Sequence, residues 1–163
     1  MDTRGALKNG INSAQTIVDA YLGDLTDADL LVRPVPGTNH LAWQLGHIIA
    51  AEHSMVEMVK PGSMPPLPAG FAEKHKKETA TNDDAKAFCT KAEYVDAMKK
   101  QRAGTLAVLS SLSDSDFDKP APEAVRGFLK TTGDVFTMQA SHWLMHAGQW
   151  AVVRRKLGKP PLF

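Results

Sequence analysis

Apolar residues recur at alternating intervals of three and four along the long segments of this 163-residue chain. This spacing places apolar side chains in one stripe along an α-helix. In the first segment the stripe consists of Leu7, Ile11, Ala14, Val18, Tyr21 and Leu25. No segment convincingly alternates apolar and polar residues, which is the pattern of a half-buried strand. The sequence therefore predicts an all-α protein without a sheet.

Capping residues and prolines divide the chain into four long helices. After the first helix, Asn39 is a candidate N-cap for a second helix that ends near Lys60. Thr90 and Glu93 have the spacing of a capping box, which predicts the start of a third helix. The fourth helix is predicted over residues 134–157, because a glycine and two prolines follow it closely.

Two stretches outside these helices carry further information. Residues 61–89 are rich in proline, lysine and glutamate, which predicts a surface excursion with one or two short helical pieces. Residues 25–30 and 112–117 have similar acidic sequences, and each leads through a basic residue into a proline. This echo indicates either two similar helix exits or two related helical hairpins packed as a bundle.

Length and charge exclude several classes of protein. A chain of this length predicts one domain, spanning residues 1–163. Its 19 Lys and Arg residues nearly balance 18 Asp and Glu residues, which argues against nucleic-acid binding. No apolar run approaches the roughly 18 residues of a membrane span, and the N-terminus lacks the apolar region of a secretory signal. The single cysteine, Cys89, cannot form an internal disulfide, so we expect a cytoplasmic protein.

Two histidines of the fourth predicted helix have the spacing of metal ligands. His142 and His146 are four residues apart, so both imidazoles project from one face of the helix. A helix can offer two nitrogens to one metal ion in this way, although the glutamate of the zinc-protease motif is absent between them. The alternative is that both are ordinary surface or core residues. Burying the pair is costly unless a partner such as a divalent cation holds both imidazoles neutral.

The second predicted helix supplies the best third ligand, His47. His40 lies seven residues earlier on a similar face and is the main rival, or a neighbour of the ligands. His53 lies about 240° around the helix from His47 and cannot easily share the site. His75 falls in the irregular segment, where we expect it to be solvated. Three protein ligands with an open position are typical of a catalytic metal site.

Large apolar residues suggest a pocket and an interface. Trp43, Trp143 and Trp150 either line a pocket for an apolar electrophile or belong to the core. Residues late in the second helix exceed what one core needs and favour a homodimer, unless they cover the proline-rich segment: Met55, Met58 and Val59.

The fourth segment combines the following residues with two closing prolines: His142, His146, Gln149, Arg155 and Gly158. Together with His47 in the sequence Leu-Ala-Trp-Gln-Leu-Gly-His-Ile, it resembles the DinB-like superfamily of four-helix bundles, many of them regarded as metal-dependent enzymes. The resemblance spans nearly the whole chain, and its specific residues lie in the second and fourth helices. It implies an up-down-down-up bundle in which the three histidines bind one divalent ion, with Gln149 beside the ligands.

The resemblance also implies a chemistry. Three neutral histidines leave the double charge of the ion uncompensated, so the ion lowers the pKa of a bound water or thiol. Members of the superfamily catalyse thiol-dependent transfer and isomerisation with low-molecular-weight thiols, which implies a transferase or isomerase acting on a small electrophile. Zinc and nickel are favoured among the ions that imidazole accepts. One alternative is a metal-dependent hydrolase, for which Glu52 is poorly placed as a base and His40 is better placed by helix angle. The other is a non-catalytic bundle that binds a metal or ligand.

Overall fold

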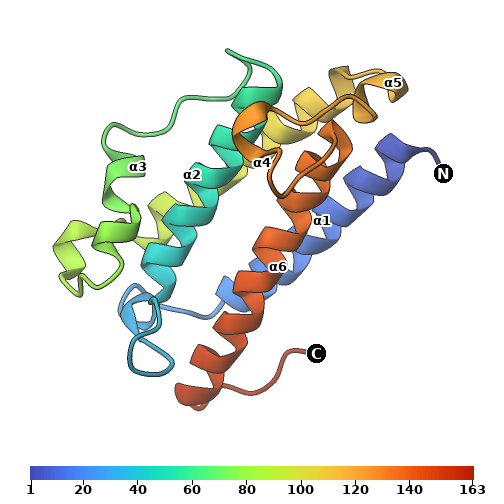
Figure 1. Ribbon diagram of the computed structural model, residues 1–163. Helices are drawn as coiled ribbons and strands as arrows, with labels where there is room; N and C mark the ends of the chain where they lie inside the picture. The colour runs from blue at the N-terminus through green and yellow to red at the C-terminus, as the bar shows by residue number, and fades with distance from the viewer.

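The computed structural model describes residues 1–163, and its regular structure is helical apart from one isolated bridge between Pro120 and Thr131. Four long helices pack along one another (Figure 1): α1 (Thr3–Leu22), α2 (Leu41–Val59), α4 (Lys91–Ser111) and α6 (Thr132–Lys156). Two short helices, α3 (Phe71–Lys74) and α5 (Asp114–Phe117), lie in the connections. The prediction of an all-α protein is therefore confirmed.

The long helices begin close to the predicted positions. Thr90 and Glu93 form the predicted capping box of α4, and Thr131 and Asp134 form another at the start of α6. The predicted cap of α2 is wrong by one residue: His40, not Asn39, is the N-cap, and its Nδ1 accepts a hydrogen bond from the backbone amide of Trp43. A neutral imidazole satisfies a free amide at a helix start as an Asn side chain would.

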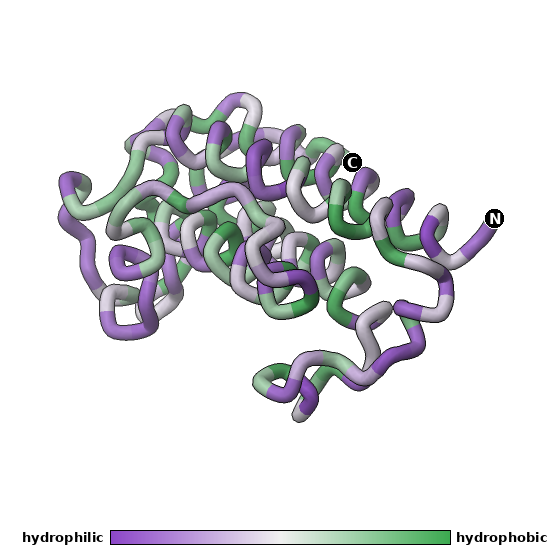
Figure 2. The backbone as a smooth tube through the Cα atoms, turned by 90° about the horizontal axis from the view of Figure 1, so that it is seen from above, coloured by the Kyte–Doolittle hydropathy of each residue, from purple (hydrophilic) through white to green (hydrophobic).

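The first and last helices pack most extensively against each other, and α2 lies between α4 and α6. Hydrophilic and hydrophobic residues alternate within successive turns of these helices (Figure 2), as expected when one face of each helix is buried. The largest core cluster includes Trp143 and Trp150, both almost completely buried, so these two indoles belong to the core. None of the helices combines the length and apolar character that crossing a bilayer requires.

The two acidic echoes adopt related turns. In the first, which leads into η1 (Asp29–Leu31), the backbone amide of Thr26 donates to Asp29 and the amide of Asp29 donates to the Thr26 hydroxyl. In the second, Asp116 accepts from the backbone amide and hydroxyl of Ser113 at the start of α5. Both repeats therefore use the same capping chemistry at the end of a long helix.

The segment between α2 and α4 contains α3 and two 3₁₀ turns, η2 (Lys77–Thr79) and η3 (Ala85–Ala87). The expectation that His75 is solvated is wrong, because its side chain is only 3% exposed. Its Nδ1 donates to the carbonyl of Phe71 at 2.7 Å, and its Nε2 accepts from the Tyr94 hydroxyl at 2.7 Å. The ring lies so close to α2 that a Cβ at Gly46 would overlap it. The two hydrogen bonds replace those that the imidazole loses to water on burial, and the close packing adds van der Waals contacts.

Candidate metal centre

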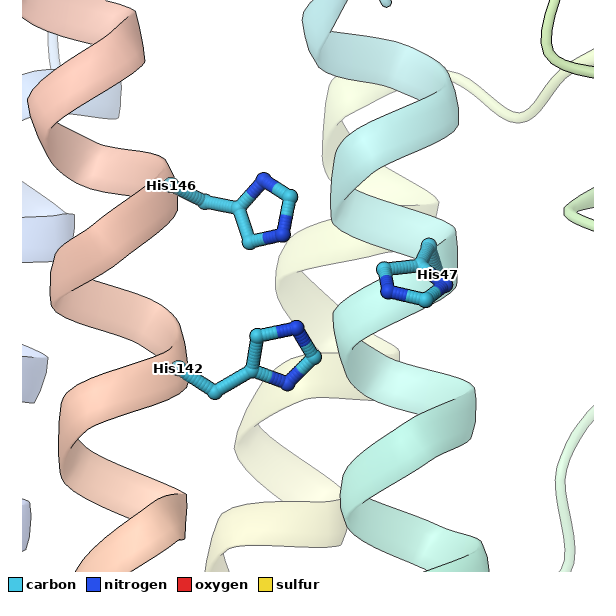
Figure 3. A group of neighbouring side chains, drawn as sticks. All are labelled: His47, His142 and His146. Carbon is cyan, nitrogen blue, oxygen red and sulfur yellow. The ribbon is translucent and has the colours of Figure 1, made fainter. Parts of the chain in front are cut away.

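Three imidazoles meet between α2 and α6. His47 projects from α2, and His142 and His146 project from successive turns of α6 (Figure 3). One ring nitrogen from each residue lies within 4.8 Å of the others, and the ring centroids are 5.0–5.7 Å apart. The structure therefore brings together the three histidines that the sequence singled out.

Burial keeps these histidines neutral. It lowers the pKa of His142 and His146 to about 4, and the neighbouring imidazoles act in the same direction. Burial also lowers the pKa of His47. A neutral imidazole has one nitrogen with a free lone pair, which is the form that binds a metal ion. The cluster is thus ready to donate three lone pairs near neutral pH.

The donor set fits a divalent cation. Three neutral nitrogen donors suit zinc, nickel and related ions, and the number leaves further coordination positions for a water or a substrate. The cluster contains no carboxylate. Glu52, the nearest acidic candidate on α2, is engaged elsewhere: it pairs with Arg102 at 3.1 Å and accepts hydrogen bonds from Thr105 and Trp143.

Two residues of the first turns of α2 support the cluster. Trp43 stacks on His47 with ring centroids 5.0 Å apart and planes 6° from parallel. The indole is held by hydrogen bonds from its Nε1 to the Lys76 carbonyl and the Thr79 hydroxyl. Gln44, which the sequence analysis missed, contacts His146: Gln44 Oε1 lies 2.9 Å from His146 Nδ1.

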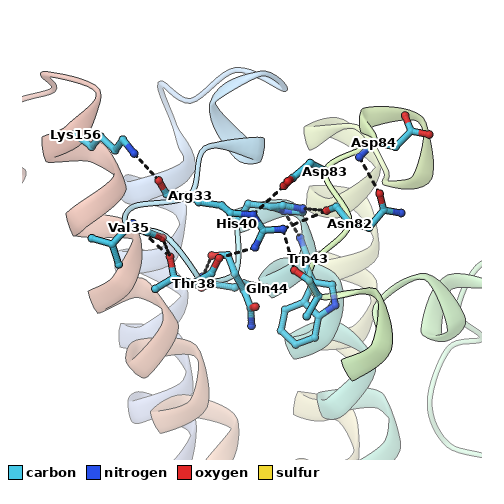
Figure 4. A network of polar contacts seen from close by, with 12 residues as sticks. Arg33, Val35, Thr38, His40, Trp43, Gln44, Asn82, Asp83, Asp84 and Lys156 are labelled. Atoms are coloured by element: carbon cyan, nitrogen blue, oxygen red, sulfur yellow. Dashed lines mark hydrogen bonds and ion pairs between the residues drawn. The ribbon is translucent and has the colours of Figure 1, made fainter.

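The predicted neighbours His40 and Gln149 lie elsewhere. His40 is completely buried at the start of α2, where its Nε2 donates to the carbonyl of Asn82 at 3.0 Å (Figure 4). Gln149 is exposed and lines a separate hollow with Val152 and the loop before α2. No hydrogen bond joins this exposed side chain to the cluster, so a place for Gln149 beside the ligands stays a prediction. His53, as expected, faces away and bonds through Nδ1 to Gln101 Oε1.

A profile of the DinB superfamily matches residues 11–150, which is most of the chain and includes all three histidines. The chain belongs to the DinB superfamily.

One solved structure agrees with the fold of this DinB-superfamily chain. A conserved protein from Enterococcus faecalis superposes with a TM-score of 0.70, covering 98% of this chain and 99% of that chain at 14% sequence identity. At this identity the likeness concerns the fold alone. A comparison with curated proteins gave no match.

An apolar hollow adjoins the cluster of this DinB-superfamily protein. It has a volume of about 440 Å³, and His142 belongs both to its wall and to the cluster. The rest of the wall is almost entirely apolar and comes from α2, α6 and the segment before α6: Ala51, Ser54, Met55, Met58, Val125, Phe128, Met138 and Met145. Four methionines line this hollow, and none of the three tryptophans that the sequence offers for a pocket wall does.

Proposed function

We propose that this protein is a metal-dependent enzyme in which His47, His142 and His146 hold one divalent ion, with zinc or nickel favoured. The observation that carries the proposal is the convergence of three neutral imidazoles from two helices within 4.8 Å. Membership of the DinB superfamily supports it. Structural histidines usually find hydrogen-bond partners in the protein. Here only the outer nitrogen of His146 has one, Gln44, and each of the three residues offers a ring nitrogen to the others.

We propose thiol-dependent transfer or isomerisation as the reaction. A bound ion would lower the pKa of a thiol in one of its remaining coordination positions, so that the thiol reacts as a nucleophile near neutral pH. The protein would contribute the three ligands and a largely apolar surrounding that excludes water. The alternative, a metal-dependent hydrolase, needs a general base near the ion, and Glu52 is already bound to Arg102.

The hollow beside His142 supports a small electrophile with an apolar body as the substrate. Its wall has no charged side chain, since His142 is neutral, so a charged substrate would lose its hydration there without compensation. Methionine side chains are flexible and accommodate apolar molecules of different shapes. The apolar part of the electrophile would lie on the methionines, with its reactive atom towards the cluster.

Three further features belong to the proposal. The four long helices would form an up-down-down-up bundle and a single domain over residues 1–163. We propose a cytoplasmic location and a homodimer, although Met55, Met58 and Val59 already pack within one chain against residues 121–138. We also propose a low-molecular-weight thiol as co-substrate.

Metal content tests the site. Protein purified without a histidine tag should contain close to one equivalent of a divalent ion by elemental analysis. His146→Ala should lose the ion, because two imidazoles bind it far more weakly than three. The matched control is His53→Ala, which removes a histidine of α2 outside the cluster and should leave the metal content unchanged. Full metal content in His146→Ala would contradict the proposal.

Turnover tests the reaction separately. Metal-loaded protein should convert an apolar electrophile only when a thiol is present, and His146→Ala should not. A transfer consumes the thiol, whereas an isomerisation regenerates it. A metal-loaded protein that binds the electrophile without turnover would indicate a non-catalytic binding protein. Hydrolysis of an ester without any thiol would favour the hydrolase.

A further inference from the structure

We propose that Gln44 is a positioning residue that sets the tautomer of His146, so that Nδ1 carries the proton and Nε2 is the metal ligand. The tautomer follows from hydrogen bonds within the protein. The assignment of Nε2 to the metal rests on the function proposed above.

The orientation of the Gln44 amide is determined from both of its ends. The side chain is completely buried. Its Nε2 lies 2.7 Å from the backbone carbonyl of Asn39, which can only accept a hydrogen bond. Its Oε1 lies 2.9 Å from the indole Nε1 of Trp150, which can only donate. These two partners come from different elements, and both contacts assign the same atom of the Gln44 amide as the oxygen.

The proton on His146 follows from this orientation. Gln44 Oε1 lies 2.9 Å from His146 Nδ1, and an amide oxygen can only accept. Nδ1 must therefore donate, and the neutral ring has its free lone pair on Nε2. Trp150 and His146 together use both lone pairs of the Gln44 oxygen, and burial keeps water from competing for them.

This arrangement prepares His146 for one ion at one nitrogen. Without a partner at Nδ1, a neutral imidazole divides its population between two tautomers and rotates more freely. A ligand whose outer nitrogen is hydrogen-bonded is held in orientation and is more basic, and losing such a partner typically costs about 10–100-fold in metal affinity. Gln44 also links His146 to the backbone just before α2, the helix that carries His47.

The wild-type protein provides the first test, by ¹⁵N-resolved NMR of the histidine rings. In metal-free protein at pH 7.5, His146 should be protonated at Nδ1 and unprotonated at Nε2. In zinc-loaded protein the Nδ1 proton should remain and Nε2 should be bound. A proton on Nε2, or zinc bound through Nδ1, would overturn the proposal without any variant being made.

Variants provide the second test, by competition of zinc with a chelator. Gln44→Met keeps the length of the side chain and should weaken zinc binding about 10–100-fold, with the His146 signals showing both tautomers. Gln44→Glu can still accept from His146 and Trp150, and should restore most of the Nδ1-protonated signal.

Gln101→Met is a matched control. Gln101 is also buried, accepts from His53 Nδ1 at 3.1 Å and donates to the Pro65 carbonyl at 2.8 Å, so the same kind of pair is removed away from the cluster. Its zinc affinity should equal that of the wild type. Wild-type zinc affinity in Gln44→Met would refute the role of Gln44. Failure of the wild type to bind zinc would refute the proposed function and leave the tautomer measurement valid.

Discussion

Gly46 lies where the backbone of α2 touches the ring of His75, directly before His47. Because Gly46 is bonded to His47, a shift of the backbone at Gly46 also shifts His47. The buried His75 thus packs the irregular segment against α2 beside the histidine cluster.

Gly46→Ala should lower the free energy of unfolding by roughly 1–3 kcal/mol, because the new methyl group must displace the imidazole of His75. Urea denaturation measures the change. Gly148→Ala is the control: this helical glycine faces open space, and the same substitution should stabilise the protein by up to about 1 kcal/mol. Equal midpoints for Gly46→Ala and the wild type would contradict the packing.

His75 also predicts a dependence of stability on pH. Burial lowers its pKa to about 4, below the 6.5 of a solvated histidine. Its stabilising contribution is therefore fully present above pH 6.5 and is lost as the pH falls towards 4. Between pH 8 and pH 5 the wild type should lose about 2 kcal/mol more than His75→Gln, which keeps hydrogen-bonding groups but does not titrate in this range. Urea denaturation measures both losses. An equal loss of unfolding free energy in the two proteins between pH 8 and pH 5 would contradict this expectation.

At the residue scale, the four-residue spacing predicted that His142 and His146 share one face, and the place of His47 in the middle of the second helix, together with the family resemblance, predicted the third member of the cluster. Local spacing did not predict their partner. The family resemblance implies a place for Gln149 beside the ligands, whereas Gln44 reaches His146 from another helix, and the pairing of helices is not encoded in local spacing. Gln44 precedes His47 by three residues, which was a usable signal. The burial of His75 depends on Tyr94 and Gly46, which lie far from it in sequence.

At the scale of helices, a buried ion pair joins three of them. Glu52 on α2 pairs with Arg102 on α4 and accepts from the indole of Trp143 on α6. Arg102 also donates to the carbonyl of Gln139. Both charged side chains are almost completely buried, so each depends on the other for its stability.

Arg102→Met should therefore lower the free energy of unfolding by about 3–5 kcal/mol, because Glu52 is left buried without its counter-charge. The double variant Glu52→Gln/Arg102→Met removes both charges and should recover a large part of the loss. Urea denaturation of the four proteins in this double-mutant cycle measures the coupling. A double variant with the summed losses of both single variants would show that the pair is not coupled.

The long helices were predictable because residues near each boundary determine it: capping residues at the start, and glycine or proline after the end. For the segment 61–89 the sequence predicted short helical pieces, and α3 with two 3₁₀ turns confirms them. The packing of this segment against the long helices was not predicted. Phe71 and Phe88 in this segment join the main core together with residues of α2 and α4. Such tertiary burial leaves no periodic pattern in a stretch of this composition.

At the scale of the whole molecule, a metal ion in the cluster would connect α2 and α6, which carry the ligands. Free zinc at about 100 times its dissociation constant should stabilise the folded protein by about 2.7 kcal/mol. Calorimetry should record a higher Tm with zinc and a lower Tm after chelation. His146→Ala should show neither change, and an equal response of that variant would place the stabilising ion elsewhere.

The proposed homodimer is tested by sedimentation velocity at micromolar concentration. Phe128 and Met145, which belong to the wall of the apolar hollow, are 63% and 58% exposed, and a partner subunit would bury their outer atoms. We expect a dimer in the wild type and a shift towards monomer in Phe128→Ser. A monomeric wild type across this range would reject the homodimer.

The contact of His75 with Gly46 restricts which residues related chains can carry at these two positions. A second contact has the same character: a Cβ at Gly104 of α4 would overlap Pro65 of the irregular segment. We therefore expect covariation among aligned members of the DinB superfamily. Members with a small residue in place of His75 should tolerate alanine or serine in place of Gly46, and members that lack the proline should tolerate them in place of Gly104. The segment that covers the helices and the glycines beneath it would then have diverged together.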